Sequence, residues 1–402
     1  MKDLLAKFTA VGRQHAELLA QVGSDPLGVR MDRVIGPTEA EIEGRRCVLL
    51  GSNNYLGLTF EPTALEGAHV ALDAAGTGTT GSRVANGSYS MHQDLERQLA
   101  AFFRRRHALL FSTGYQANVG MLSAIAGRDD TVLIDSDCHA SIYDGCKLSD
   151  ATVQRFRHND PENLDRRLAR LQAPGNALVV IEGIYSMLGD RAPVREIAEV
   201  TRRHGAYLMV DEAHSLGVTG PGARGVAAEA GVADKVDFIV GTFSKSVGTI
   251  GGFCAADHDA LEAIRLSARA YLFTASLPPA VVASARCTLE RMRTDPGLRD
   301  RLWANAEIVY DGLARMGFEL GPEKTPVIAV RMPDTQTGLA TWRDLLDAGV
   351  YVNLALPPAT PNGNCLLRCS VCAAHSADQL DHVLAAFARV ADAPDWRGTA
   401  AE

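Results

Sequence analysis

Residues 206–214 read AYLMVDEAH, an apolar run that ends in ionisable groups. The run predicts a short buried β-strand with Asp211 and His214 at its carboxyl end. Residues 238–243 repeat the arrangement, because a second apolar run there leads to Lys245. In an open α/β sheet, ligands bind beyond the carboxyl ends of the strands. We therefore expect Asp211, His214 and Lys245 to lie at one edge of a sheet.

Similar apolar runs occur earlier in the chain, and helical patterns separate them. The predicted strands are His107–Phe111, Thr131–Asp135, Ala177–Glu182, 206–211 and 238–243. One separating helix is predicted to begin at Pro161 after a cap at Asp160, and another covers 194–204. Strands that alternate with helices in this way form a mostly parallel sheet with helices on both faces. The predicted fold class is therefore α/β.

The pattern changes after about residue 280. A long helical stretch is predicted over 280–316, and the strands and terminal helix after it are typical of a smaller α+β domain. The predicted strands of this part are 327–331, 351–354 and 365–372, and the terminal helix starts from a capping box of Ser376 and Gln379. We divide the chain into an N-terminal helix and strand arm (1–50), a large domain (51–280) and a small C-terminal domain (281–402).

The composition is that of a globular protein with a large core. Of the 402 residues, 47% are hydrophobic and 22% charged, and the formal net charge is −8. A nucleic-acid-binding protein usually has a basic face, and the chain has no long run of Lys and Arg. The sequence also lacks an apolar stretch of about 18 residues and a signal-peptide core. We therefore expect a cytoplasmic protein that has free thiols, no integral membrane segment and no nucleic-acid partner.

Two motifs point weakly to other ligands. Cys365, Cys369, Cys372 and His375 include a Cys-x-x-Cys spacing that can bind zinc, but no second ligand pair stands at the spacing of a zinc finger. Residues 76–81 match the dinucleotide pattern Gly-x-Gly-x-x-Gly, but a helical pattern precedes them where a strand is required. We expect neither a metal nor a dinucleotide.

A lysine, a carboxylate and an anion site at one sheet edge point to pyridoxal phosphate (PLP). A lysine amine forms an imine with the PLP aldehyde, and a carboxylate keeps the pyridine nitrogen protonated so that the ring can accept electrons. The phosphate needs backbone N–H groups, which a glycine turn at a helix N-terminus supplies. Lys245 fits the first role, Asp211 the second, and Gly114 with Tyr115 the third.

The motifs around these residues resemble the α-oxoamine synthase family of PLP enzymes, which has the aspartate-aminotransferase-like fold. The matching segments are 53–57, 81–83, 111–118, 139–141, 211–217 and 242–246. Within the family, the Ser-Lys-Ser sequence around Lys245 resembles the soluble bacterial serine palmitoyltransferases, since other branches usually have Gly-Lys-Ala there. The resemblance covers nearly the whole chain.

The resemblance implies the residues that hold the cofactor. His139 is expected to stack on the ring, and His214 to hydrogen-bond near the ring hydroxyl or the substrate carboxylate. With Lys245 and Asp211, the two histidines form the implied catalytic group. The family is dimeric with shared active sites, which implies a homodimer. The residues expected around the phosphate are Gly114, Tyr115, Thr242 and Ser244, with Thr274 and Ala275 reaching the phosphate of the other subunit.

The resemblance also implies an acyltransferase reaction of sphingolipid biosynthesis. L-serine condenses with a long-chain acyl thioester and loses CO2 to give 3-ketodihydrosphingosine, with coenzyme A or an acyl carrier protein as the donor. Asn54 and Arg368 are expected to hold the serine carboxylate. Leu356 stands where this branch often has an arginine, directly before the Pro-Pro-Ala-Thr-Pro run of 357–361. A related synthase that uses glycine or L-alanine with another acyl-CoA therefore remains the alternative.

Overall fold

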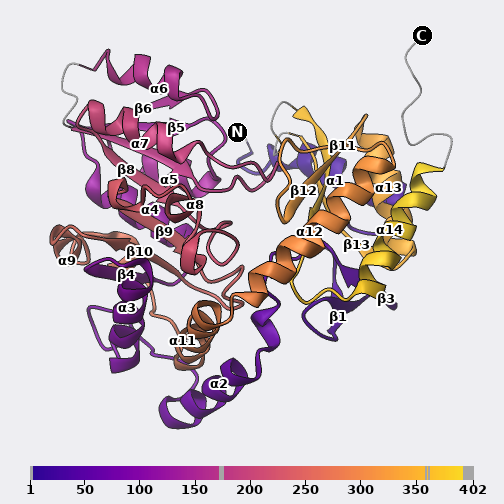
Figure 1. Ribbon diagram of the computed structural model, residues 1–402, viewed down its shortest axis with the longest axis horizontal. Coiled ribbons are helices and arrows are strands. Elements are labelled where there is room, and N and C mark those ends of the chain that lie inside the picture. Colours follow the sequence, from indigo (N-terminus) through magenta and orange to yellow (C-terminus); the bar gives the residue numbers. More distant parts are fainter. Residues whose placement is uncertain (1–2, 172–175, 358–359, 361–362, 393–402) are drawn as a thin grey trace. The chain divides into compact units, whose positions relative to one another are not determined.

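The computed structural model describes residues 3–171, 176–357, 360 and 363–392. The chain divides into two compact units, which are Asn53–Trp303 and a second unit built from Met1–Ser52 and Ala304–Glu402. Figure 1 labels the helices and strands of both units.

The unit Asn53–Trp303 contains a seven-stranded sheet. Its order is β4 (His107–Phe111), β10 (Gly252–Ala256), β9 (Phe238–Thr242), β8 (Tyr207–Asp211), β7 (Ala177–Glu182), β5 (Thr131–Asp135) and β6 (Thr152–Phe156). Strand β10 runs antiparallel to both of its neighbours, and all other pairs are parallel. The mostly parallel sheet predicted from the sequence is confirmed, and the five predicted strands are all present.

Helices cover the sheet because the strands are apolar on both sides. One face packs against α4 (Gly114–Ile125), α5 (Ala140–Lys147), α9 (Ala260–Ile264) and α10 (Arg269–Leu272) in a buried cluster that includes Met121 and Ile142. Alternate strand residues such as Val179 and Val210 point to the opposite face and are also fully buried. Burying one such side chain contributes about 1.5–3 kcal/mol. The other helices of this unit are α2 (Pro62–Ala75), α3 (Ser90–Phe103), α6 (Pro161–Leu168), α7 (Val194–Arg203), α8 (Val226–Glu229) and α11 (Pro279–Thr294).

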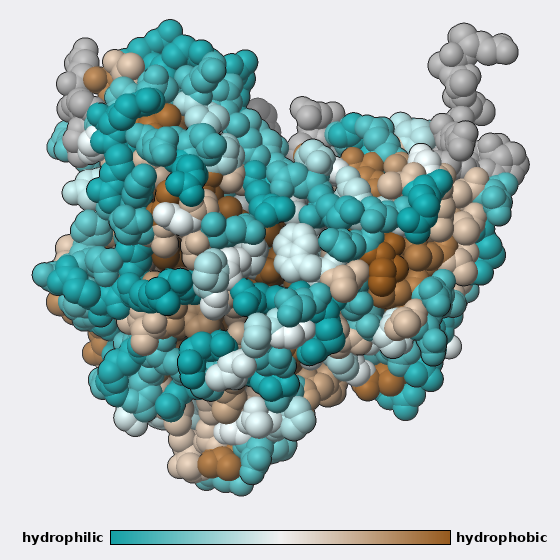
Figure 2. Space-filling model, viewed as in Figure 1, coloured by the Kyte–Doolittle hydropathy of each residue, from teal (hydrophilic) through white to brown (hydrophobic). Residues whose placement is uncertain are grey.

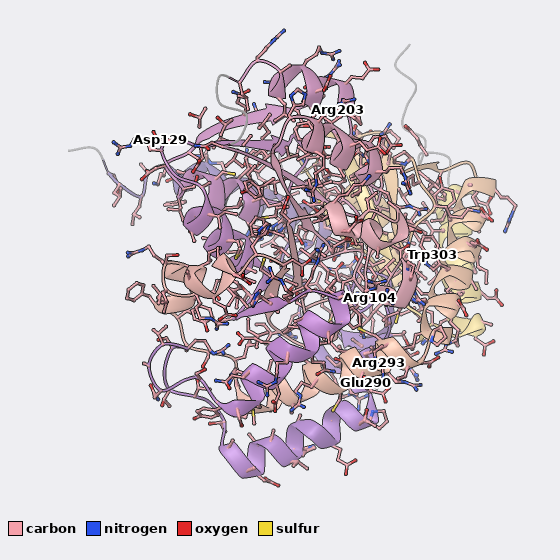
Figure 3. The ribbon with its side chains drawn as sticks, turned by 60° about the vertical axis from the view of Figure 1, so that its left-hand side comes forward. Arg104, Asp129, Arg203, Glu290, Arg293 and Trp303 are labelled. Atoms are coloured by element: carbon pink, nitrogen blue, oxygen red, sulfur yellow. The ribbon has the colours of Figure 1, made fainter. Side chains whose placement is uncertain are left out.

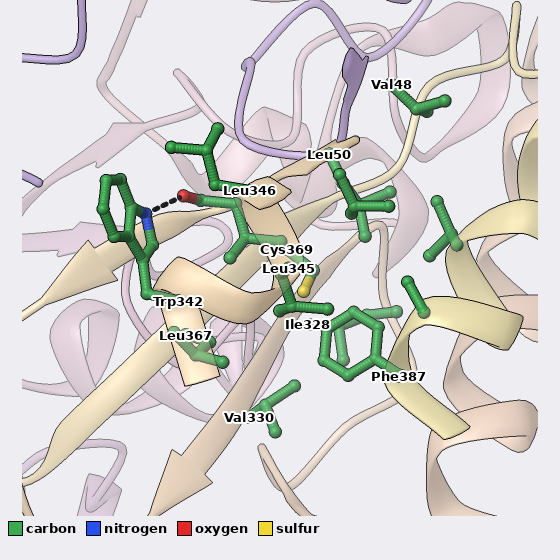
Figure 4. Close-up of a cluster of buried hydrophobic side chains, with 14 of the residues drawn as sticks. Val48, Leu50, Ile328, Val330, Trp342, Leu345, Leu346, Leu367, Cys369 and Phe387 are labelled. Carbon is green, nitrogen blue, oxygen red and sulfur yellow. Dashed lines mark hydrogen bonds between the residues drawn. The ribbon is translucent and has the colours of Figure 1, made fainter. Parts of the chain in front are cut away.

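The second unit contains two four-stranded sheets. The first has the order β1 (Met31–Val34), β2 (Glu39–Ile42), β3 (Arg45–Leu49) and β13 (Val350–Tyr351), and the second has the order β11 (Glu319–Leu320), β12 (Val327–Met332), β15 (Cys365–Ser370) and β14 (Asn353–Ala355). Figure 4 shows part of its core, in which Trp342 donates its indole N–H to Val352 O at 3.0 Å. Its helices are α1 (Phe8–Val22), α13 (Thr335–Asp347) and α14 (Ala377–Ala391). Helix α12 (Gly297–Arg315) begins in the first unit and continues into the second from Ala304.

Two sequence predictions for the C-terminal part are wrong in detail. The single helical stretch predicted over 280–316 is two helices, α11 and α12, and the break falls at Asp295 and Pro296. Proline lacks a backbone N–H and cannot continue the helical hydrogen bonds. The strand predicted over 351–354 is also divided, because β13 pairs with β3 and β14 pairs with β15. The predicted capping box of Ser376 and Gln379 is confirmed at the start of α14.

The surface carries scattered hydrophobic side chains. Figure 2 shows hydrophobic atoms at the lower end of the view, over α2, where Leu65, Val70 and Leu72 are exposed. Among the described residues, none of the helices has the length and apolar character needed to span a membrane.

Candidate active site

A cavity of about 230 Å³ lies at the carboxyl ends of the parallel strands, within the unit Asn53–Trp303. It collects side chains that follow β4, β5, β7, β8 and β9, which are far apart in the sequence. The lining residues are Thr113, Gly114, Tyr115, Asn118, His139, Ser141, Glu182, Asp211, Ala213, His214, Thr242, Ser244 and Lys245. All the site residues predicted from the sequence are among them except Asn54, Thr274, Ala275 and Arg368.

Asp211 is the last residue of β8 and is buried at the floor of the site. Its Oδ2 accepts a hydrogen bond from Asn118 Nδ2 at 2.7 Å, and its Oδ1 accepts one from the Ala213 N–H at 2.9 Å. The Asn118 amide also donates to Ser141 Oγ at 3.0 Å. These bonds fix the orientation of the Asp211 carboxylate relative to α4 and α5.

His139 is the N-cap of α5 and continues this network. Its Nδ1 accepts a hydrogen bond from the Ser141 N–H at 3.2 Å and lies 2.8 Å from Ser141 Oγ. The surrounding protein removes water from the ring and lowers the pKa of His139 below 6.5, although Asp211 opposes this effect; the positive charge of Lys245 lowers the pKa further. The ring is therefore neutral at pH 7. Since Nδ1 is an acceptor, the proton of the neutral ring is on Nε2.

Glu182 is a site residue to which the sequence assigned no role. It ends β7, is 3% exposed, and accepts a hydrogen bond from the His139 N–H through Oε1. Burial raises the pKa of Glu182 well above its ordinary value, and the negative charge of Asp211 raises it further. The one available signal in the sequence was an acidic residue at the end of a fully buried strand. Such a residue is also compatible with a helix cap, so the signal was weak.

A glycine is required where α4 begins. A Cβ at Gly114 would lie 2.6 Å from Thr242 Cβ and 2.8 Å from Thr242 Oγ1, closer than any side chain tolerates. Thr113 caps the helix, because its Oγ1 accepts the Gln116 N–H at 3.1 Å. Thr242 Oγ1 lies 2.9 Å from Ser244 Oγ. The Thr242 hydroxyl also donates to Gly251 O at 2.9 Å. The helix N-terminus faces the cavity beside these two residues and supplies the backbone N–H donors that an anion needs.

His214 and Lys245 face the cavity from the ends of two adjacent strands. His214 Nδ1 lies 2.7 Å from the hydroxyl group of Tyr55, and both side chains are buried. Lys245 follows β9 and is partly buried. Lys245 therefore brings a primary amine to the same cavity as the Asp211 carboxylate.

Tyr115 is the second residue of α4, and Thr274 and Ala275 lie near the start of this helix. The Tyr115 hydroxyl donates to Asp144 Oδ2, although the side chain as a whole is largely exposed. Thr274 Oγ1 accepts a hydrogen bond from Gln116 Nε2 at 3.2 Å, and Ala275 O accepts one from Ser112 Oγ at 2.6 Å. The contact of Thr274 and Ala275 with another subunit stays a prediction.

The two residues expected to hold the substrate carboxylate belong to different units. Asn54 is buried in the same unit as the cavity and donates its amide to Thr59 Oγ1 at 2.9 Å. Arg368 lies on β15 in the second unit, is buried, and donates from Nη1 to Ser370 Oγ at 2.8 Å. Their joint role stays a prediction. Leu356 packs against the core of the second unit, and Pro358, Ala359 and Pro361 lie outside the described residues.

The cysteine cluster considered for zinc is part of the core of the second unit. His375 Nδ1 accepts the Cys372 N–H at 3.0 Å, and its Nε2 lies 3.2 Å from Leu49 O. Burial lowers the pKa of His375 to about 4, so the ring is neutral and donates from Nε2 to the carbonyl oxygen. With both nitrogens in hydrogen bonds, the ring has no lone pair to offer a metal.

The groups that line the cavity fit PLP, which has an aldehyde, a basic ring nitrogen and a phosphate. Lys245 supplies the amine and Asp211 a buried carboxylate held by two donors. The α4 N-terminus at Gly114 supplies N–H groups, and a side chain at that position would clash with Thr242, which lines the same cavity. These groups match the three parts of PLP that a protein must hold.

Known proteins are similar to this chain over most of its length. The sequence pattern of the family described as aminotransferase class I and II matches residues 45–387. A serine palmitoyltransferase from Caulobacter vibrioides is 56% identical over 94% of this chain and 94% of its own length.

Solved structures are also similar to the whole chain. A Sphingomonas wittichii serine palmitoyltransferase has a TM-score of 0.94 at 50% identity and covers 97% of this chain and 98% of its own. A serine palmitoyltransferase variant from S. paucimobilis, with bound PLP-myriocin aldimine, has a TM-score of 0.95 at 47% identity with the same coverage. The chain therefore belongs to the aminotransferase class I and II family.

Proposed function

We propose that this protein is a PLP-dependent acyltransferase of the serine palmitoyltransferase type. It condenses L-serine with a long-chain acyl thioester and releases CO2 and the free thiol, giving 3-ketodihydrosphingosine. The observation that carries the proposal is the cavity in which Lys245, Asp211, His139 and the N-terminus of α4 meet. The named relatives, which match the chain over nearly its whole length, support the choice of reaction.

The residues that would hold the cofactor act on different parts of it. Lys245 would bind the aldehyde covalently, and Asp211 would accept a hydrogen bond from the protonated ring nitrogen. The neutral His139 ring would stack on the cofactor, and the Gly114 turn would bind the phosphate with Thr242 and Ser244. When bound, PLP supplies an electron-poor ring that takes up the negative charge that develops at the amino-acid Cα.

Lys245 is the residue that would move the proton. With serine bound in the site, the Lys245 amine would act as the base that removes the proton from the serine Cα. A bond then forms between Cα and the acyl carbonyl carbon, the C–S bond breaks, and the thiol leaves. The carboxyl group leaves as CO2, and a proton returns to Cα. Lys245 would serve both proton transfers.

Asp211 and its two hydrogen-bond donors would keep the charge on the ring nitrogen in place. A carboxylate that must reorient during the reaction stabilises charge poorly, whereas one already held by Asn118 and the Ala213 N–H needs no reorganisation. Asn118 thus becomes a candidate residue that supports the reaction without touching the substrate. Ser141 links Asn118 to His139, so Asp211 and His139 belong to one hydrogen-bond network.

Substrate binding and assembly complete the proposal. Arg368 and Asn54 would bind the serine carboxylate, for which a planar guanidinium is well shaped. The protein would act as a homodimer in the cytoplasm, with Thr274 and Ala275 of each subunit contributing to the other's phosphate site.

The reaction is tested by supplying the purified, PLP-loaded protein with palmitoyl-CoA and L-serine, L-alanine or glycine separately. Thiol release is followed with a thiol reagent, and the amine product is identified by mass spectrometry. The proposal predicts thiol release with L-serine and a product with the mass of 3-ketodihydrosphingosine. Thiol release with glycine or L-alanine but not with L-serine would refute it and favour the alternative synthase that Leu356 leaves open.

A further inference from the structure

His158 contacts Asp135, the residue at which the segment that carries His139 begins. His158 follows β6, and its ring meets a carboxylate on each side. Its Nδ1 lies 2.8 Å from Asp135 Oδ1, and its Nε2 lies 2.7 Å from Asp190 Oδ2. Both carboxylate side chains are buried, with 0% and 6% of their surfaces exposed. The ring of Tyr185 meets the His158 ring edge-on, at 85° and 4.5 Å between centroids.

The two carboxylates make His158 a permanent cation at physiological pH. Burial alone would lower the pKa of His158, but the hydrogen bonds to Asp135 and Asp190 outweigh this effect and raise the pKa to about 10. Asp137 Oδ2 lies 3.9 Å from the same ring and adds to the negative surroundings. The ring therefore donates from both nitrogens at once.

The topology shows what this double hydrogen bond joins. In the sheet, β5 lies between β7 and β6, so the turns after β6 and β7 are not neighbours. His158 reaches across the carboxyl end of β5 to Asp190, which lies in the turn after β7. Asn159 reinforces the link, because its N–H donates to Asp135 Oδ2 and its Nδ2 to Asp190 Oδ2, each at 2.8 Å. We call His158, Asn159, Asp135 and Asp190 the His158 clamp.

The clamp lies close to the site in the chain. Asp135 is the last residue of β5, and its Oδ1 also accepts the Asp137 N–H at 2.9 Å. Two residues after Asp137 the chain reaches His139, whose N–H donates to Glu182 Oε1. The segment 135–139 is therefore held at its start by the clamp and at its end by the strand that precedes Asp190.

A metal site is the competing interpretation of this cluster. Among the described residues, the ligand atoms of Asp135, Asp137 and His158 lie within 4.8 Å of one another. However, a histidine ligand needs a free lone pair on one ring nitrogen, and both nitrogens of His158 donate to carboxylates. The geometry therefore favours a structural ion triad.

We infer that His158 is a positioning residue that, through Asp135 and Asp190, fixes the turn carrying His139 and thereby the orientation of the His139 ring in the cavity. The use of His139 to hold the cofactor rests on the proposed function, whereas the orientation of its ring does not. Removing the clamp is expected to free the segment 135–139 and to let Nδ1 of His139 leave the Ser141 N–H.

The test is the tautomer of His139, measured by nitrogen NMR of histidine-labelled protein without cofactor. In the parent, His139 is expected as the tautomer protonated on Nε2, with its signals assigned from a His139→Gln variant. His158→Gln is expected to give a mixture of both tautomers. The tautomer decides the question, because it reports which ring nitrogen of His139 faces the Ser141 N–H.

A matched control uses a histidine–carboxylate pair away from the cavity. His204 Nε2 lies 2.8 Å from Asp165 Oδ1, next to Arg203, which is labelled at the top of Figure 3. His204→Gln should leave the His139 signals unchanged. If folded His158→Gln protein keeps a single Nε2 tautomer for His139, the inference is wrong and the clamp serves stability alone.

Asp190→Asn provides a second route if His158→Gln does not fold, because it keeps the size and one oxygen acceptor while removing the charge. The same mixture of tautomers is expected, and an unchanged single tautomer again contradicts the inference. In the loaded enzyme, either variant should lower kcat about tenfold or more and leave KM for L-serine within about twofold. A protein that condenses no amino acid would refute the proposed function, while the NMR measurement would still decide the role of His158.

Discussion

Two regions combine reactive side chains in the sequence: the carboxyl edge of the seven-stranded sheet, and the turn after β15 that holds Cys372 and His375. In the structure these side chains have different surroundings. At the sheet edge, Lys245, Asp211 and His139 face a common cavity. In the turn, Cys372 is buried and His375 uses both ring nitrogens in hydrogen bonds to the backbone. Reactive residue types thus mark a site only where the fold leaves their polar atoms facing a shared space.

The largest expected effect is at Lys245. Lys245→Ala should abolish the visible absorbance of the bound cofactor and lower kcat by about a thousandfold or more, because it would remove both the proposed covalent link and the proposed base. Lys235, which precedes the other end of β9, provides the control. Lys235→Ala should keep the spectrum and near-parental activity. An unchanged spectrum for Lys245→Ala would show that Lys245 does not bind the PLP aldehyde.

The second-largest loss of kcat is expected at Asp211. Asp211→Asn keeps the shape of the side chain but removes its charge, so the protein should still bind PLP while kcat falls about a hundredfold or more. Steady-state kinetics and an absorbance titration with PLP separate the two effects. Asp234→Asn, on an exposed turn of the same unit, is the control. Near-normal turnover in Asp211→Asn would show that this carboxylate does not partner the ring nitrogen.

Gly114 tests the anion site of the same edge. Gly114→Ala places a methyl group 2.6 Å from Thr242 Cβ, which must push α4 and Thr242 apart. The affinity for PLP should fall by about tenfold or more, measured by titration of the cofactor-free protein. A second variant, Gly78→Ala, adds a methyl group with no neighbour within 4 Å and should bind PLP normally. Equal affinities for the two variants would contradict an anion site at Gly114.

His375 tests whether the turn after β15 is part of the core and not a metal site. The pKa of His375 is lowered to about 4 in the folded protein, so the native ring resists protonation below the ordinary value of 6.5. The contribution to stability is complete above pH 6.5 and is lost as the pH falls towards 4, by about 1.4 kcal/mol per pH unit and about 3 kcal/mol in total.

Urea unfolding of His375→Gln between pH 8 and 4.5 checks this effect. The variant should be less stable at pH 8 and should lose less stability on acidification than the parent. Addition of a zinc chelator should change neither protein. Parallel pH profiles for the two proteins, or a loss of stability with the chelator, would contradict a core histidine.

The smallest expected effect is at Leu356. Leu356→Arg restores the residue that the related branch often carries and should lower KM for L-serine a few-fold if that arginine helps bind the carboxylate. Kinetics with L-serine, L-alanine and glycine provide the measurement. An unchanged KM for all three would leave Arg368 as the main carboxylate ligand.

The sequence was informative where structure is local. A short apolar run followed by a polar residue predicts both a buried strand and what stands at its carboxyl end, so β8 with Asp211 and β9 with Lys245 could be read directly. Motifs of the α-oxoamine synthases then supplied roles for His139 and His214, which spacing alone does not give.

The sequence was uninformative where structure depends on distant partners. Asn118 donates a hydrogen bond to Asp211, which lies 93 positions later in the chain, and a local sequence pattern cannot predict such a long-range hydrogen bond. Strand β10 is a short run of small residues whose place between β4 and β9 is set by long-range pairing. The break at Pro296 was readable, but the helical periodicity on both sides of it concealed the turn.

The proposed function depends most directly on which lysine binds the cofactor. Borohydride reduction of the PLP-loaded protein makes the bond between lysine and cofactor permanent, and peptide mass spectrometry then locates it. We expect one pyridoxyl group, on the peptide that contains Lys245. A pyridoxyl group on Lys235 or another lysine, or none on a protein that binds PLP, would contradict this expectation.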